Sequence, residues 1–271
     1  DRLATTAYEQ TQAGPDMFGE KPKMPLEDVY GRLKPSPDEG GLFAEPPTKE
    51  TAEPTEDKRY EIPKSKEQIA KEIQGITIPE LSQWAIDNAP NAPARAIADA
   101  IHTRMLQYEK RNMFKAPVEV KNNSSRFRGG TRGRTSYAYS ARGITFHLSF
   151  NGIVNGKADR ATGTNYITIL HELLHVATTA ELQLLGKDSA LYNDLNKVLA
   201  KVRKQIREDK AAGVKHPVLE GVARGANTVK NVKELVSWGM TDPDFQDYLS
   251  KIQFGKKNAF GQLVQLFRKM L

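Results

Sequence analysis

The chain has 271 residues, 38% of them hydrophobic and 27% charged, so it is long enough to bury a core and has the composition of a globular protein. It contains no cysteine, which excludes disulfides and thiolate metal ligands, and any metal must therefore be bound by His, Asp or Glu. No stretch approaches the run of about 20 apolar residues that a membrane-spanning helix needs. Because the first residue is Asp1 and not Met, we expect a processed product or a piece of a longer protein.

The net charge of +7 is unevenly distributed along the chain. Residues 1–60 have 8 Lys and Arg against 13 Asp and Glu, whereas residues 61–271 have 32 against 20. An acidic segment therefore precedes a basic one. A basic surface of this kind could contact nucleic acid, anionic lipid, an acidic partner or the chain's own acidic segment.

Proline dominates the start of the chain, since nine of the fifteen prolines lie in residues 1–65. Apolar residues are sparse there and show no period, so the segment cannot bury enough apolar surface to offset its ordering entropy. We expect residues 1–64 to form an extended, acidic arm without a core of its own. An ordered arm would need the rest of the chain or an assembly partner to hold it.

Helical and β patterns follow in turn and predict an α+β fold, with a small sheet beside a mainly helical body. Residues 65–115 read as three short helices, and residues 116–155 as a β region. In the latter, apolar residues alternate with polar ones over residues 144–150, which predicts a half-buried strand. Residues 164–271 read as helices again, the first running from Thr164 to Leu185 and ending at Gly186.

The motif HELLH lies on that helix and predicts a metal site. His171 and His175 are four residues apart, so they stack on one helical face, where both imidazoles can ligate one Zn²⁺. Glu172 lies about 100° around the helix, outside the ligand set but within reach of a metal-bound water as general base. The helix is apolar on most sides and hence buried, so its polar groups need partners. Alternatively, both histidines bond neighbouring carbonyls and Glu172 is solvated.

A His₂ site needs a third ligand, and Glu234 in the segment NVKELVSW is the favoured one, because a later helix delivers the Glu in His₂Glu zinc sites. Glu181 is closer in sequence but lies about 280° from His171 on an unbroken helix, so it points away. His216 and Glu220 are alternatives.

Three further features suggest binding roles. The strand over residues 144–150 could be the edge strand that pairs with an extended substrate. His147 on its polar face either reaches the substrate or is simply an exposed strand histidine. His216 could contact the substrate oxyanion. The loop Arg126–Arg134 is rich in Arg and Gly, which indicates either a phosphate-binding, nucleic-acid-contacting loop or a mobile solvated loop that could be a processing site.

The segments HELLH, ELVSWGMTDPDFQDYL and AFGQLVQLFRKML resemble the metallopeptidase-like modules of large polyvalent proteins from phages and mobile elements, over about residues 136–271. The resemblance implies a zincin-like domain over residues 65–271, with a small antiparallel sheet beside a mainly helical body. It also implies Zn²⁺ bound by His171, His175 and Glu234, with Glu172 as the base that hydrolyses a protein or peptide substrate. The wider group is similar to Glu-zincins such as thermolysin, which carry Asp four residues after the ligand Glu, where this chain has Trp238.

A zinc-dependent metallopeptidase is therefore the leading functional hypothesis. The resemblance further implies a phage virion component, or a protein that acts in the host cytoplasm after injection. One rival hypothesis is a structural or ejected virion protein that keeps a peptidase-like fold for binding. Another is a nucleic-acid-binding module that uses the basic surface.

Overall fold

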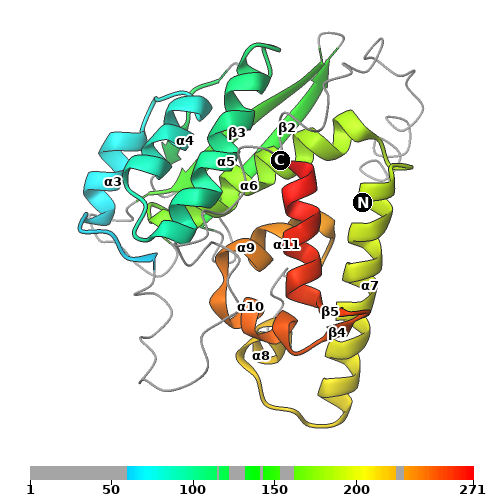
Figure 1. The fold of residues 1–271 in the computed structure, drawn as a ribbon. Coiled ribbons are helices and arrows are strands. Elements are labelled where there is room, and N and C mark those ends of the chain that lie inside the picture. The colour runs from blue at the N-terminus through cyan, green and yellow to red at the C-terminus, as the bar shows by residue number, and fades with distance from the viewer. Residues whose placement is uncertain (1–59, 115, 122–131, 141–142, 153–161, 224–228) are drawn as a thin grey trace, which may run out of the picture.

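The computed structural model describes residues 60–114, 116–121, 132–140, 143–152, 162–223 and 229–271 (Figure 1). Within these ranges the protein is mostly helical, with one three-stranded sheet and one two-stranded hairpin, so its class is α+β as predicted. No helix in the same ranges is long and apolar enough to cross a membrane. Most of the predicted arm, residues 1–59, lies outside the described residues.

Three helices open the described chain: α3 (Lys66–Ile73), α4 (Ile78–Asp87) and α5 (Ala92–Glu109). Ser65 and Thr77 each form a capping box with the Gln or Glu three residues later, which satisfies the first backbone N–H groups of α3 and α4. Gly75, with a φ of 81°, reverses the chain after α3 in a left-handed conformation that favours glycine.

The three-stranded sheet contains β1 (Glu119–Lys121), β2 (Gly133–Ser140) and β3 (Gly143–Asn151) in the order β1-β3-β2. Strands β2 and β3 are antiparallel, whereas β1 and β3 are parallel. The expectation of a purely antiparallel sheet is therefore wrong. The chain runs from β1 to the far edge, forms β2 there, and returns as β3 between the two, and this path makes β1 and β3 point the same way.

Helix α6 (Tyr166–Leu185) carries the HELLH motif and lies at the centre of the molecule. Asn165 caps its first turn by accepting a hydrogen bond from the Thr168 amide, and Gly186 ends it with a φ of 79°. These ends agree with the predicted helix to within two residues. The helix packs against α4 and α5, against β2 and β3, and against α9 (Val232–Thr241), so it is buried on almost every side.

The remaining elements form a helical subassembly around α9. They are α7 (Ala190–Ala211), α8 (Pro217–Ala223), α10 (Pro243–Ser250), the hairpin β4 (Gln253–Phe254) with β5 (Lys257–Asn258), and α11 (Ala259–Met270). Helix α11 packs against both α7 and α9. The break between α9 and α10 falls at Asp242, which caps α10 ahead of Pro243 at the first helical turn.

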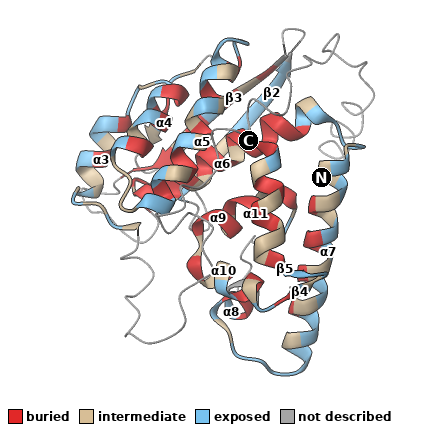
Figure 2. Ribbon diagram, viewed as in Figure 1, coloured by how far each residue is buried: buried red, intermediate tan, exposed pale blue. Residues whose placement is uncertain are grey.

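Buried apolar side chains from the helices and from β3 form one continuous core (Figure 2). The core extends to residues 60–64, at the end of the segment predicted as an arm. The ring of Tyr60 stacks on that of Tyr166 with centroids 6.5 Å apart, and Ile62 also packs against the core. These residues therefore belong to the folded body, which positions α6 rigidly.

Candidate metal centre

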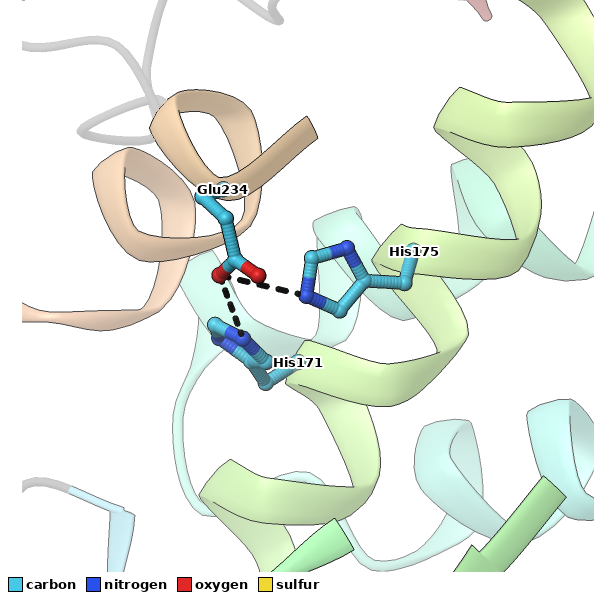
Figure 3. Close-up of side chains that lie close together, drawn as sticks. All are labelled: His171, His175 and Glu234. Atoms are coloured by element: carbon cyan, nitrogen blue, oxygen red, sulfur yellow. Dashed lines mark ion pairs between the residues drawn. The ribbon is translucent and has the colours of Figure 1, made fainter. Parts of the chain in front are cut away.

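Helix α6 presents His171 and His175 on the face that packs against α9 (Figure 3). The helix continues unbroken through Thr178, so the one-turn spacing of the two histidines is kept and their ring centroids lie 4.7 Å apart. Both side chains are largely buried, with exposed fractions of 13% and 14%.

Helix α9 brings Glu234 to these two rings from a segment about 60 residues later in the chain. Asn231 caps α9 by accepting a hydrogen bond from the Glu234 amide, which fixes Glu234 in the first turn. Its Oε2 lies 3.5 Å from His175 Nε2 and 3.9 Å from His171 Nε2. Ligand atoms about 2.0–2.1 Å from a tetrahedral zinc lie roughly 3.3 Å from one another, so the spacing is close to that of a zinc site.

Each imidazole has one hydroxyl group from α9 close to its Nδ1, the ring nitrogen that does not face Glu234. Thr241 Oγ1 is 3.3 Å from His171 Nδ1, and Ser237 Oγ is 3.3 Å from His175 Nδ1. The Thr241 hydroxyl already donates its only hydrogen to the Ser237 carbonyl, at 2.7 Å, so it can only accept from His171. This arrangement favours the tautomer in which His171 Nδ1 carries the proton and the Nε2 lone pair faces the centre.

Trp238, one helical turn after Glu234, contacts the site directly. Its indole N–H donates to Glu234 Oε2 at 3.2 Å, and its ring packs edge-on against His171 with centroids 4.7 Å apart. Trp238 therefore orients the candidate third ligand, while Ser237 and Thr241 contact the histidines in place of a carboxylate.

Glu172 lies between α6 and strand β2, beside the cluster and outside its three ligand atoms. It is 7% exposed, and Thr135 Oγ1 donates a hydrogen bond to its Oε2 at 2.6 Å. Burial raises the pKa of the Glu172 carboxyl above its ordinary value, while the nearby His175 and the Thr135 hydrogen bond act in the opposite direction. A carboxyl in this environment is suited to taking and giving a proton.

The three groups at the centre fit a divalent cation by the chemistry of their donors. Two imidazole nitrogens and one carboxylate oxygen lie within 4.8 Å of one another and form a group that could hold a metal ion. Burial, with the neighbouring His175, lowers the pKa of His171 well below its ordinary value, so His171 is neutral and its Nε2 is an acceptor. A cation at this position would interact favourably with the His171 Nε2 lone pair and with the Glu234 carboxylate.

Glu181 lies on the same helix but belongs to a different cluster. The Tyr108 hydroxyl donates to Glu181 Oε1 at 2.6 Å, and Arg104 Nε lies 3.6 Å from the same oxygen. Glu181 therefore points away from the histidines, as its angle on an unbroken helix predicts.

The structure does not bring His147 or His216 into the metal group. The predicted edge strand, β3, is the central strand of the sheet, and β2 is the edge strand near α6. His147 is exposed on β3, opposite Ser136 and on the face away from the buried side chains. His216 Nε2 lies 3.4 Å from Asp247 Oδ2 and its ring packs on Tyr248, both from α10.

Two further candidates from the sequence are Glu220 and the Arg126–Arg134 loop. Glu220 is exposed on α8 and does not belong to the metal group. Most of the Arg126–Arg134 loop lies outside the described residues, and of its arginines only Arg132 and Arg134 are described, both exposed.

Sequence reasoning missed the side chains that support the ligands. Ser237 and Thr241 lie three and seven residues after Glu234, which puts all three on one face of a helix, and this spacing could have identified them. Thr135 has no comparable signal, because its contact with Glu172 depends on how β2 packs on α6.

Comparison of the chain with family models, with curated proteins and with solved structures found no match.

Proposed function

We propose that this protein is a zinc-dependent peptidase of the HExxH type with a zincin-like fold. The observation that carries the proposal is the convergence of His171, His175 and Glu234 from two helices, with their ligand atoms within 4.8 Å of one another. Glu172, the neighbour of His171 in sequence, lies beside this group, close to His175 and Glu234, and accepts a hydrogen bond from Thr135. Two His, one Glu and an adjacent carboxylate are the residue types that metal-assisted peptide hydrolysis requires.

In this proposal the three ligands bind Zn²⁺, which when bound would polarise a peptide carbonyl and make an attacking water more acidic. Glu172 accepts the proton of that water and later donates it to the leaving amine, for which a raised pKa is suitable. Trp238 keeps the Glu234 carboxylate turned toward the histidines through its indole N–H. Ser237 and Thr241 keep each imidazole in the orientation that presents Nε2.

Strand β2 is the element best placed to bind an extended peptide. Within the described residues it has β3 on one side and no strand on the other, so its outer edge is the one that an extended peptide could join. Thr135 connects β2 to Glu172, and Lys233, which precedes Glu234, donates to the Tyr137 hydroxyl at 3.3 Å. A peptide that added to this edge would lie next to the metal group.

Replacing Glu172 with glutamine tests the proposal, because glutamine keeps the size of the side chain but cannot accept the proton. We expect Glu172→Gln to lower the cleavage rate of fluorescein-labelled casein by roughly 10²–10⁴-fold. Its zinc content, measured by mass spectrometry, should remain that of the wild type, since the three ligands are unchanged. Glu220→Gln, at an exposed position on α8, is the matched control and should cleave at the wild-type rate.

Equal cleavage by wild type and Glu172→Gln would contradict the proposal. Zinc binding by both proteins without cleavage of casein or of a longer precursor would also contradict it, and would favour a binding role for the same fold.

A further inference from the structure

We propose that strand β2 holds the Glu172 carboxylate in place, with Thr135 as the positioning residue that binds it and Gly133 as the residue that leaves room for it. The inference rests on the proposed role of Glu172 as general base. It extends the site to a strand about 35 residues before the HELLH motif, where no sequence motif marks either residue.

Thr135 contacts Glu172 through its hydroxyl group. Thr135 Oγ1 lies 2.6 Å from Glu172 Oε2 and 3.1 Å from the Glu172 carbonyl oxygen. A hydroxyl has one hydrogen to donate, and the short distance assigns it to the carboxylate. Hydrogen bonds to an ionised oxygen are stronger and more directional than neutral ones, so this contact restricts the rotation of the Glu172 side chain.

Gly133 lies two residues earlier on the same face of β2 and is in direct contact with Glu172. A Cβ at position 133 would lie 2.7 Å from Glu172 Cγ and 3.0 Å from its Oε1. The first distance is shorter than real Cβ contacts, so any other residue would displace the side chain. Glycine at this position therefore allows Glu172 to pack against the strand.

These two contacts have a direct consequence for the proposed reaction. A glutamate has three rotatable side-chain bonds, and a base must present one oxygen to the attacking water at hydrogen-bond distance. Loss of a positioning contact increases the fraction of unproductive conformers, which lowers the rate of the chemical step. The metal ligands and the outer edge of β2 are not altered, so neither zinc affinity nor substrate binding should change.

Thr135→Val is the informative substitution, because valine keeps the shape and the strand preference of threonine but has no hydroxyl. With fluorescein-labelled casein, we expect kcat to fall by about 10- to 100-fold, which is the loss expected for a hydrogen bond to a charged group. KM and zinc affinity should stay within about twofold of wild type, since neither contact is affected. Thr135→Ser should restore most of the rate.

Thr103→Val is the matched control, because Thr103 is exposed on α5 and its hydroxyl donates to the Asp99 carbonyl of the same helix. It should cleave casein at the wild-type rate. Gly133→Ala should lower kcat in the same way as Thr135→Val, because the added methyl group displaces Glu172.

A second measurement does not depend on activity. Urea unfolding of wild type, Thr135→Val, Glu172→Ala and the double variant forms a double-mutant cycle. Alanine is used here because glutamine could still accept the Thr135 hydrogen bond. We expect the effects to be non-additive, with the double variant less destabilised than the sum of the single ones, because each single variant already removes the contact.

Wild-type kcat in Thr135→Val would overturn the inference, as would a parallel loss of zinc affinity or a failure of Thr135→Ser to recover. Additive effects on unfolding would also overturn it, because they would show that the two residues do not interact. An inactive wild type would instead refute the peptidase proposal, and the unfolding cycle would still decide whether Thr135 holds the carboxylate.

Discussion

Helix α6 contributes to two polar clusters, which differ in the groups that face their carboxylates. At one end, Glu181 accepts a hydrogen bond from Tyr108 and lies beside Arg104, so an acceptor meets a donor and a positive charge. At the other end, two imidazole nitrogens and the Glu234 carboxylate face one another. In the first cluster the chain itself supplies a donor and a positive charge, whereas the second is a group that could hold a metal ion.

This difference explains why only one of the two glutamates belongs to a candidate metal site. Glu181 is near His175 in sequence, and Glu234 is near both histidines in space. Both glutamates are largely buried, with side-chain exposures of 10% for Glu181 and 19% for Glu234. A carboxylate beside a hydroxyl donor and an arginine stabilises the fold, while one that faces two imidazole nitrogens is placed to bind a metal ion with them.

Substitution of Glu234 should have the largest effect and should separate the two clusters. Zinc binding energies of roughly 10–16 kcal/mol over four ligands correspond to about 3–4 kcal/mol each, so Glu234→Ala should weaken zinc binding by about 10²–10³-fold. Competition with a chelating indicator measures this. Glu181→Gln, which can still accept from Tyr108, is the control and should bind zinc like wild type. The reverse result would move the third ligand onto α6.

Substitution of Glu181 with alanine should lower stability rather than metal affinity. It leaves the buried Tyr108 hydroxyl without an acceptor and Arg104 without its carboxylate, which should lower the free energy of unfolding by about 2–3 kcal/mol. Urea denaturation measures the change. A free energy of unfolding equal to that of wild type would show that the contacts of Glu181 with Tyr108 and Arg104 do not stabilise the fold.

Removal of the hydroxyls that orient the histidines should have a smaller effect than removal of a ligand. Ser237→Ala and Thr241→Val should each weaken zinc binding by roughly 10-fold, at the lower end of the range for partners of metal ligands. The same competition assay applies, with Ser250→Ala on α10 as a control for serine removal. Unchanged zinc affinity in both variants would show that Trp238 and Glu234 alone determine the geometry.

The sequence was informative where local rules determine structure. The ends of α6 followed from its apolar pattern and from Gly186, and the pairing of His171 with His175 followed from helical spacing. The exclusion of Glu181 followed from the angle between residues on an unbroken helix, and Glu234 was favoured because it lies on a later helix, as in His₂Glu zinc sites.

The sequence was uninformative where packing between distant segments decides the outcome. The parallel pairing of β1 with β3 and the position of β2 at the edge depend on the path of the chain across the sheet. The strand that meets Glu172 is therefore β2 and not β3. For the same reason, the sequence left open whether His147 reaches the substrate or is an exposed strand histidine, as it is on β3, and Thr135 was not predicted at all.

The zinc content of the purified protein tests the central claim most directly, namely the proposal that the His171, His175 and Glu234 cluster binds a metal ion. The protein would be loaded with zinc, dialysed against metal-free buffer and analysed by mass spectrometry beside the His171→Ala/His175→Ala variant. We predict one zinc per wild-type chain and almost none in the variant. Equal zinc in both proteins, or none in either, would contradict the account.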